Sequence, residues 1–381
     1  MLSNADLVEL TAWRRDLHRH PDLSGDEGAT AARVVQALAA LPGAAVVTDL
    51  GGHGVAAVFK GAAPGPTVMF RAELDGLPIH EIADLPHRSL TPGRGHMCGH
   101  DGHMAMLMGL GRLIARQPPA RGRVILLFQP SEEDGAGAAA VLADPTFAAL
   151  RPDWAFAIHN MPGLPLGHVG LAAGPANCAS CGLRAVLTGK TSHASAPEAG
   201  LSPAPAIARL VAGLQALGPG GAVVPGYRLA TITHLAVGEP TFGVAPGQGE
   251  IRVTLRALID ADMADLMAGA TALIRTEAAR DGLAVEITRH DDFAACTNDA
   301  QATAVMVRGL EALSIPHDGQ GLPMRASEDF GRFGSVAKSA MVLLGAGVEH
   351  AMLHNPDYDF PDDLIPVGVA LFDRIRRDLL G

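Results

Sequence analysis

Five of the nine residues from Gly95 to His103 carry side chains that bind metal ions, in the order Gly-His-Met-Cys-Gly-His-Asp-Gly-His. A thiolate and a neutral imidazole bind borderline-soft divalent ions best, and Cys98 and His100 stand two positions apart, so a looped backbone can direct both at one point. A histidine-rich surface turn is the alternative interpretation, but a free cysteine has little reason to lie in such a turn. The stretch therefore indicates a metal site.

The backbone around this stretch favours a loop that leads into a helix. The three glycines at 95, 99 and 102 disfavour a regular helix through the segment, whereas 104–114 is an apolar run with helical composition. Asp101 is placed to cap that helix. We therefore expect the ligands to lie in the loop before the helix N-terminus.

Four short apolar segments, each typical of a buried strand, end in residues that can do chemistry. The segments 67–71, 124–128, 154–158 and 340–344 lead to Glu73 and Asp75, to Glu132 and Glu133, to His159, and to His350 and His354 respectively. Helical stretches at 29–41, 104–116 and 136–142 separate most of them, as expected of an α/β sheet. Ligands of such sheets bind outside the carboxyl ends of the strands, so these side chains are predicted to converge there.

The candidate metal ligands are Cys98, His100, Glu133, His159 and His354, with Glu132 beside them. They suffice for two ions that share a ligand, and two ions about 3.5 to 4 Å apart can hold a bridging water, lower its pKa and polarise a carbonyl. This predicts a hydrolase site. Glu132 and Glu133 cannot easily face one atom from an extended backbone, so one would bind metal while the other acts on the water as general base. A solvated acidic turn is the alternative for this pair.

Composition limits the classes of protein that fit. The length of 381 residues favours two domains, and the net charge of -11 without a basic, aromatic-rich cluster argues against a nucleic-acid partner. The chain has no apolar stretch long enough to span a membrane and lacks the order of a signal peptide at its N-terminus. Four cysteines do not form a disulfide framework, so we expect a reducing cytoplasm.

The middle of the chain has its own order of elements. Strand, helix, strand, strand, helix and strand are predicted in turn over 183–187, 203–217, 228–237, 250–258, 263–280 and 283–290. This is the β-α-β-β-α-β order of a ferredoxin-like α+β domain. We therefore predict an α/β catalytic domain with a mixed central sheet flanked by helices, formed by 1–180 and 293–381, and a second domain inserted over 181–292.

Cys178 and Cys181 have the spacing of a redox or zinc pair. No second cysteine pair accompanies them, and they lead into a strand rather than into a helix that would stabilise a thiolate. Two small, half-buried thiols beside a hinge are the favoured interpretation.

Six motifs carry a close family resemblance over most of the chain. They are Trp13-Arg-Arg-Asp-Leu-His-Arg-His-Pro, Arg71-Ala-Glu-Leu-Asp-Gly-Leu-Pro, Met97-Cys-Gly-His-Asp-Gly-His, Phe128-Gln-Pro-Ser-Glu-Glu, Ser327-Glu-Asp-Phe and Leu353-His-Asn-Pro. In this order they resemble the two-metal amidohydrolases related to aminoacylase. Within that family the chain is similar to the branch of hippurate hydrolases, indole-acetyl-amino-acid hydrolases and N-acyl-amino-acid deacylases.

The resemblance implies that the inserted domain over 181–292 is a lid and dimerisation domain, and it implies a role for each candidate. Cys98, His100, Glu133, His159 and His354 would bind two divalent ions (Zn, Mn, Co or Ni), and Glu132 would be the catalytic base. His193, in Lys190-Thr-Ser-His-Ala-Ser, matches a histidine that reaches into a partner's active site and stabilises the oxyanion, and Arg256, in Thr254-Leu-Arg-Ala, matches an arginine that binds the substrate carboxylate. The chain departs from the family at Gly243, where asparagine is expected, and at Glu73, where aspartate is usual.

Three hypotheses follow. The first is a cytoplasmic hydrolase that cleaves the amide of a small N-acyl amino acid, works as a homodimer or tetramer assembled through the lid, and has no nucleic-acid or membrane partner. The second is a protein of the same fold that binds metal or a small molecule without turnover, which Gly243 permits and Glu132 argues against. The third is a thiol hydrolase with Cys98 and His100 as a dyad, which leaves the other ligands without a role.

Overall fold

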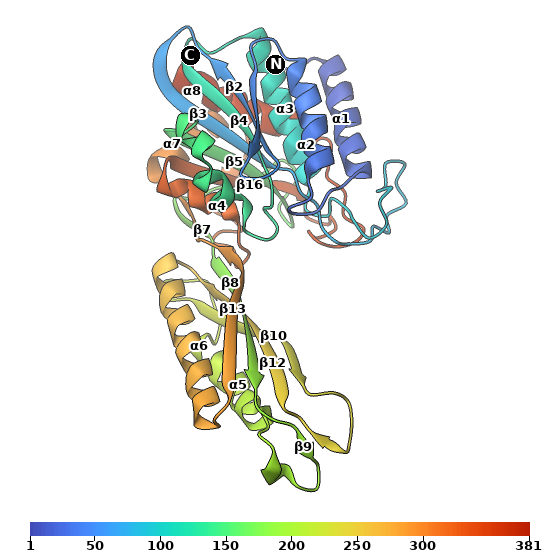
Figure 1. Ribbon diagram of the computed structural model, residues 1–381. Helices are drawn as coiled ribbons and strands as arrows, with labels where there is room; N and C mark the ends of the chain where they lie inside the picture. Colours follow the sequence, from blue (N-terminus) through green and yellow to red (C-terminus); the bar gives the residue numbers. More distant parts are fainter. The chain divides into compact units, whose positions relative to one another are not determined.

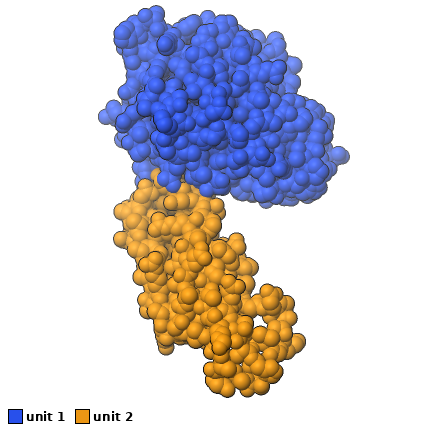
Figure 2. All heavy atoms as spheres, in the orientation of Figure 1, with its two compact units in different colours: residues 1–176, 296–322, 329–381 blue, residues 177–295, 323–328 orange.

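The computed structural model describes residues 1–381, which form two compact units (Figure 2). Unit 1 comprises Met1–Ala176, Cys296–Leu322 and Asp329–Gly381, and unit 2 comprises Asn177–Ala295 and Pro323–Glu328. The sequence analysis expected the second unit to be a single insertion over 181–292. The short segment Pro323–Glu328 also belongs to unit 2, where the backbone N–H of Cys178 donates to the carbonyls of Met324 and Ala326 at 3.2 and 3.1 Å. A sequence pattern does not reveal this backbone pairing across a long separation.

The main sheet of unit 1 has eight strands in the order β1-β2-β4-β3-β5-β16-β6-β15 (Figure 1). Its strands are β1 (Ala45–Leu50), β2 (Gly54–Lys60), β3 (Ala63–Glu73), β4 (Arg121–Gln129), β5 (Trp154–Pro162), β6 (Val169–Gly170), β15 (His317–Asp318) and β16 (Lys338–Gly347). A separate pair joins β7 (Gly174–Asn177) to β14 (Cys296–Asn298). The sheet is mixed, as predicted.

The four central strands, β4, β3, β5 and β16, run parallel to one another. Their side chains are buried over most of their length, which explains why the sequence shows continuous apolar runs there rather than alternation. Parallel pairing brings the carboxyl ends of these strands to one edge, with Glu73 of β3 opposite Gln129 of β4, and His159 of β5 opposite Leu343 of β16. The predicted convergence of the strand ends follows from this register.

Six α-helices flank the sheet of unit 1. They are α1 (Asn4–Arg19), α2 (Gly28–Ala39), α3 (His100–Arg116), α4 (Gly137–Ala143), α7 (Ala300–Ala312) and α8 (Leu364–Leu380). Helices α3 and α8 pack on each other and on β3, α7 packs on β16, and α2 packs on β2. Short 3-10 helices cover Pro145–Ala149 and Asp329–Ser335. None of the helices combines the length and apolar composition needed to cross a bilayer.

Helix α3 begins earlier than the sequence analysis predicted. Its N-cap is Gly99, which has φ 86°, and His100, Asp101 and Gly102 already lie in the first turn. Asp101 does not cap the helix, because its carboxylate binds Arg14 instead, at 3.1 Å. The left-handed N-cap conformation suits glycine, and a Cβ at Gly99 would lie 2.1 Å from Asn160 Oδ1. The glycine therefore permits a sharp entry into the helix, and a ligand candidate stands at its first position.

Unit 2 is an α+β sandwich with the predicted order of elements (Figure 1). Its elements are β8 (Ala179–Thr188), β9 (Ser192–His193), a 3-10 helix (Pro197–Ala199), α5 (Ala204–Leu217), β10 (Arg228–Val237), β11 (Val244–Ala245), β12 (Gln248–Ala257), α6 (Asp260–Arg280) and β13 (Ala284–Phe293). The four long strands are ordered β10-β12-β8-β13. Alternate residues of β8 and β12 form one core with α5 and α6. The ferredoxin-like prediction is thereby confirmed.

Candidate metal centre

The six candidate residues of the metal site and its base come together in unit 1, at the carboxyl edge of the parallel strands. Cys98 Sγ lies 3.5 Å from His159 Nε2, and His100 Nε2 lies 3.8 Å from both Glu132 Oε2 and Glu133 Oε1. His354 Nε2 lies 3.6 Å from Glu133 Oε2. These separations exceed hydrogen-bond length for nitrogen and oxygen and leave room for an ion between the atoms.

Two triads together contain all five candidate ligands and share one residue, and a further group joins His100 and Glu133 to Glu132. Cys98, His100 and His159 form one triad, and Cys98, Glu133 and His354 form the other, with all ligand atoms within 4.8 Å of one another in each. Cys98 is the common member, so a single thiolate can contact two ions. The donor set of sulfur, imidazole nitrogen and carboxylate oxygen fits a pair of first-row divalent ions.

Hydrogen bonds orient two of the histidines for binding through Nε2. His100 Nδ1 lies 2.8 Å from the carbonyl oxygen of Asp75, and His159 Nδ1 lies 2.7 Å from the carbonyl oxygen of Asn160. A carbonyl accepts only from a protonated nitrogen, so both rings carry a proton on Nδ1, which leaves Nε2 as the atom that can bind a metal ion once it is deprotonated. His100 Nε2 is buried and has no hydrogen-bond partner. Such a nitrogen is suited to a metal ion, and the carbonyl partners fix both rings.

His103 stands in the same motif but is not available as a ligand. Its Nε2 accepts the backbone N–H of Asn160 at 3.1 Å, and its Nδ1 donates to Glu73 Oε2 at 2.7 Å. The other oxygen of Glu73 binds Arg71. Both residues are buried and use their polar atoms within the protein. Glu73, one of the two departures from the family pattern, thus forms a support behind the site.

His354 is positioned by its backbone rather than by a ring hydrogen bond. It has φ 66°, which is unusual for a residue with a side chain, and its N–H donates to the carbonyl of Met97 at 2.8 Å. This contact ties the loop after β16 to the residue before Cys98. His350, which the sequence analysis placed on the same loop, binds the carbonyl of Asp359 instead, at 2.7 Å.

The electrostatic environment indicates a surplus of negative charge. Burial raises the pKa of the Cys98 thiol well above its usual range, and the carboxylates of Glu133, Glu132 and Glu73 raise it further. Burial lowers the pKa of His100, but its interaction with Asp75 and the nearby carboxylates outweigh burial and raise that pKa to about 10. A divalent cation would neutralise this charge and release protons from both ligands.

The same environment weakens the hypothesis of a thiol hydrolase. A nucleophilic cysteine needs a lowered pKa, whereas burial and three carboxylates raise that of Cys98.

Asp75 is a supporting residue to which the sequence analysis gave no role. Its Oδ2 accepts the backbone N–H of Glu133 at 3.0 Å and the hydroxyl of Ser24 at 2.8 Å, while its carbonyl holds His100. In the sequence, the only indication of such a role is that Asp75 lies just past the end of β3. The groups that it contacts are known only from the fold.

A second buried network lies at the start of α3. Arg14 is fully buried and binds Asp101, Asp359 and Asp362 at 3.1, 2.6 and 2.9 Å. His18 Nδ1 lies 2.9 Å from Asp101 Oδ2. Burial lowers the pKa of His18, but Asp101 and Glu81 outweigh this effect and raise it to about 9. The first sequence motif, which contains Arg14 and His18, therefore supports the turn that carries His100.

His193 and Arg256 belong to unit 2. His193 is exposed on β9, opposite Val244 of β11, with Nδ1 2.7 Å from Ser195 Oγ. Gly243 accepts the backbone N–H of Ala194 at 3.1 Å, and a Cβ there would meet nothing within 4 Å. The structure therefore gives no steric reason for glycine in place of the family's asparagine.

Arg256 is half-buried and its guanidinium has no carboxylate partner. Nη1 donates to Ser327 Oγ at 2.7 Å and to the carbonyl of Arg325 at 3.0 Å. The nearby hydroxyl of Tyr227 is buried and also has no partner. Burial lowers the pKa of Arg256, since no carboxylate offsets the cost of desolvation.

The two cysteines of unit 2 pack against different groups of residues. Cys178 packs with Tyr227 and Leu258, whereas Cys181 packs in the core between the sheet and its helices. Both thiols are free and buried. This arrangement favours a packing role for each.

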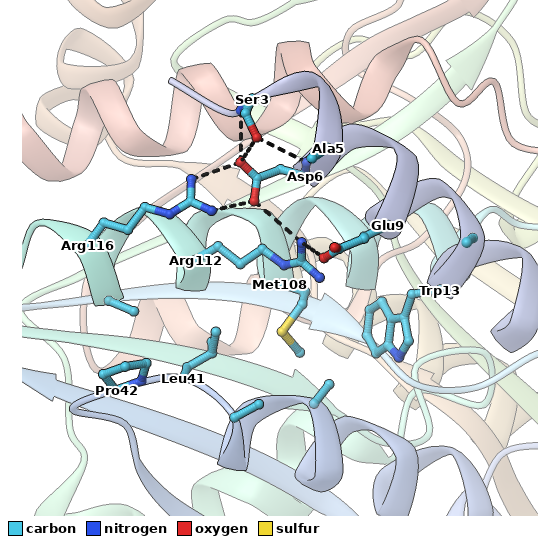
Figure 3. A pocket seen from close by; sticks show the side chains of 14 residues that line it. Ser3, Ala5, Asp6, Glu9, Trp13, Leu41, Pro42, Met108, Arg112 and Arg116 are labelled. Carbon is cyan, nitrogen blue, oxygen red and sulfur yellow. Dashed lines mark hydrogen bonds and ion pairs between the residues drawn. The ribbon is translucent and has the colours of Figure 1, made fainter.

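A groove of about 770 Å³ lies on α1, α2 and α3 (Figure 3). Its floor includes Trp13, Leu41 and Met108, and its charged residues are paired with one another, as in the contact of Arg116 with Asp6 at 2.8 Å. No candidate metal ligand lines this groove.

Several known proteins are similar to this chain over two thirds or more of its length. The chain is 33% identical to the N-acetylcysteine deacetylase of Bacillus subtilis over 257 residues, which cover 67% of each chain. It is 28% identical to the hippurate hydrolase of Campylobacter jejuni over 98% of this chain and 97% of that protein. The crystal structure of a dinuclear metal-binding M20 peptidase from Bacillus subtilis superposes with a TM-score of 0.83 and 25% identity, covering 100% of this chain and 99% of that one. Residues 69–378 match the profile of peptidase family M20/M25/M40, and the chain belongs to this family.

Proposed function

We propose that this protein is a metal-dependent amidohydrolase that cleaves the amide bond of N-acyl amino acids to a carboxylate and an amine. The observation that carries the proposal is the pair of ligand triads that share Cys98, with Glu132 beside them. The names of the relatives, which include deacetylases and a hippurate hydrolase, support the substrate class.

Two divalent ions would be held by the two triads. Cys98, His100 and His159 would hold one, and Cys98, Glu133 and His354 the other. When bound, the ions would supply an activated water and polarise the amide carbonyl. Zn, Mn, Co and Ni all suit this ligand set, and the thiolate favours the softer ions among them.

Glu132 would act as general base and then as general acid. Its side chain is almost fully buried, and its Oε2 lies 3.8 Å from the ligand nitrogen of His100. From there it can accept a proton from the attacking water and deliver it to the departing amide nitrogen. A positioned carboxylate of this kind contributes on the order of 10² to 10⁴ in rate.

Arg256 would bind the carboxylate of the amino-acid half of the substrate. Its guanidinium is anchored by Ser327 but lacks a counter-ion, and a planar fork of donors matches a carboxylate in geometry and charge. The unpartnered hydroxyl of Tyr227 offers one more donor in the same part of unit 2.

His193 would act on the site of a partner subunit in a homodimer formed through unit 2. The imidazole of His193 is exposed, and its contact with Ser195 reveals no role for it within unit 2. The chain between β10 and β12 exposes Phe242 and Val244, and β10, an edge strand of its sheet, exposes Leu235. Exposed apolar side chains beside an edge strand favour association with a second copy. We place this assembly in the cytoplasm, where Cys98 would remain reduced.

The test is a screen of metal-reconstituted protein against N-acetyl, N-benzoyl and longer N-acyl amino acids, read as kcat/KM. We expect turnover that is lost with a chelator and restored by divalent ions, and a loss of turnover when the substrate carboxylate is replaced by a neutral amide. Absence of turnover on the whole panel by protein that carries two ions per chain would overturn the proposal in favour of a binding protein.

A further inference from the structure

A short segment before α2 braces the loop that carries Glu132. In this segment, Glu27 Oε1 accepts the backbone N–H of Ser131 at 2.8 Å and its hydroxyl at 3.2 Å. The same oxygen accepts the N–H of Gly25 at 2.9 Å. Glu27 is fully buried, and its other oxygen has no hydrogen-bond partner. Burial of a glutamate costs free energy, and the three hydrogen bonds that Oε1 accepts offset part of that cost.

The loop itself has an uncommon conformation at the anchored residue. Ser131 has φ 51°, in the left-handed region that residues with a side chain rarely adopt. Its carbonyl accepts the N–H of Gly137 at 2.9 Å, which closes the loop between β4 and α4. Conformations of this kind persist where the surrounding contacts hold them, and they occur often at active sites. Here the residue that follows the strained position is Glu132.

Two carboxylates therefore hold the backbone on the two sides of Glu132. Glu27 binds the amide of the residue before it, and Asp75 binds the amide of Glu133, the residue after it, at 3.0 Å. Ser24 donates to the same oxygen of Asp75 at 2.8 Å. The segment that supplies Glu27 therefore also contacts Asp75, the second of the two carboxylates. These two contacts hold the backbone directly before and directly after Glu132.

We propose that Glu27 is a positioning residue for the general base: its contact with the Ser131 amide fixes the turn that aims Glu132 at the reacting water. The inference rests on the proposed function, because it needs Glu132 to act as base. Glu27 itself touches neither the ligands nor the substrate. The loss of an outer partner of this kind typically costs 10- to 100-fold in activity.

The test compares Glu27→Met with Glu27→Gln. Methionine keeps the length of the side chain but has no acceptor for the Ser131 amide, whereas glutamine keeps a carbonyl oxygen at that place. We expect Glu27→Met to lower kcat by roughly 10- to 100-fold with little change in KM or in the number of ions bound, and Glu27→Gln to stay within about threefold of wild type. Amide exchange provides a readout without turnover: in metal-free protein, the peptide that contains Ser131 should exchange faster in Glu27→Met than in Glu27→Gln.

Asp22→Ala is the matched control. Asp22 lies in the same segment and stabilises the start of α2 by accepting the N–H and hydroxyl of Thr30 at 2.8 and 2.9 Å. It should lower the melting temperature but leave kcat close to wild type. If Asp22→Ala lowered kcat as much as Glu27→Met, or if Glu27→Met kept full kcat with Glu132→Gln inactive, the positioning role would be wrong. Turnover retained by Glu132→Gln would instead overturn the proposed function.

Discussion

The two units hold most of their functional candidates in different ways. In unit 1 the candidate ligands Cys98, His100 and His159 are buried, and both histidine rings are fixed by hydrogen bonds to carbonyls, whereas His354 is exposed. In unit 2 His193 is exposed and Arg256 is only half-buried, with no carboxylate partner. A buried metal centre needs fixed donors before the ion arrives, whereas groups that meet the substrate or a partner must stay accessible. The difference predicts that unit 1 binds the metal ions and supplies the general base, whereas unit 2 supplies groups that contact the substrate of its own chain or of a partner.

The sharpest test of that division is the pair of neighbouring glutamates in unit 1. Glu132→Gln should lower kcat by roughly 10² to 10⁴ and keep both ions, because it removes the proton acceptor but not a ligand. Glu133→Gln should lose metal, because a neutral amide is a poorer ligand than a carboxylate. Elemental analysis beside steady-state kinetics reads both outcomes. If the two variants exchanged phenotypes, the roles of base and ligand would be reversed.

His193→Ala should lower kcat by roughly 10² to 10³ with metal content unchanged, since a donor aimed at developing charge acts mainly in the transition state. Mixing tests whether it acts across a dimer. Inactive His193→Ala protomers combined with inactive Glu132→Gln protomers should recover part of the activity, because one site of each heterodimer would have both residues. No recovery despite proven subunit exchange would place His193 outside the partner's site.

Cys98 differs from the other candidate ligands of unit 1 because it belongs to both triads. Cys98→Ser should weaken the binding of both ions, because a hydroxyl binds soft ions poorly and the residue belongs to both triads. His354→Ala should weaken the binding of only one ion. Titration with Co²⁺, followed by visible absorption, should show two weakened sites in the first variant and one in the second. Loss of a single ion from Cys98→Ser would show that the thiolate is not shared.

Arg256→Ala should raise KM by roughly 10- to 100-fold for carboxylate-bearing substrates, the worth of a charge-assisted contact. The matched neutral amides and esters should lose far less, because they make no such contact. Kinetics on both substrate series provides the comparison. Equal losses would show that Arg256 only anchors the Ser327 segment of unit 2.

The smallest effect concerns the stability of unit 1. The pKa of His18 is raised to about 9 from an ordinary 6.5, so the stability that its charge contributes is fully present below pH 6.5 and is lost as the pH rises through 9. Unfolding free energies measured between pH 6 and pH 10 should fall by on the order of 3 kcal/mol more in wild type than in His18→Gln. Parallel curves for the two proteins would show that folding does not change the pKa of His18.

The sequence was informative where local pattern and parallel pairing act together. Apolar runs followed by acids and histidines predicted the strands and their shared edge, and the register of β3, β4, β5 and β16 confirms this arrangement. The predicted start of α3 was wrong. Asp101 was assigned to the helix cap, whereas Arg14 and His18, which are far away in sequence, bind its carboxylate. No local rule identifies a partner at that separation.

The sequence by itself determined the two kinds of unit, the family and the set of residues able to bind metal, because periodicity and residue type are local properties. Only the tertiary structure decided how those residues are used. His103 has the same side chain as His100 and lies three positions on, yet the backbone of Asn160 and the carboxylate of Glu73 occupy both of its nitrogens. The bracing of Glu132 by Glu27 and Asp75 likewise joins segments far apart in the chain. Hydrogen-bond partners are set by packing, and packing brings together residues whose sequence separation gives no sign of the contact.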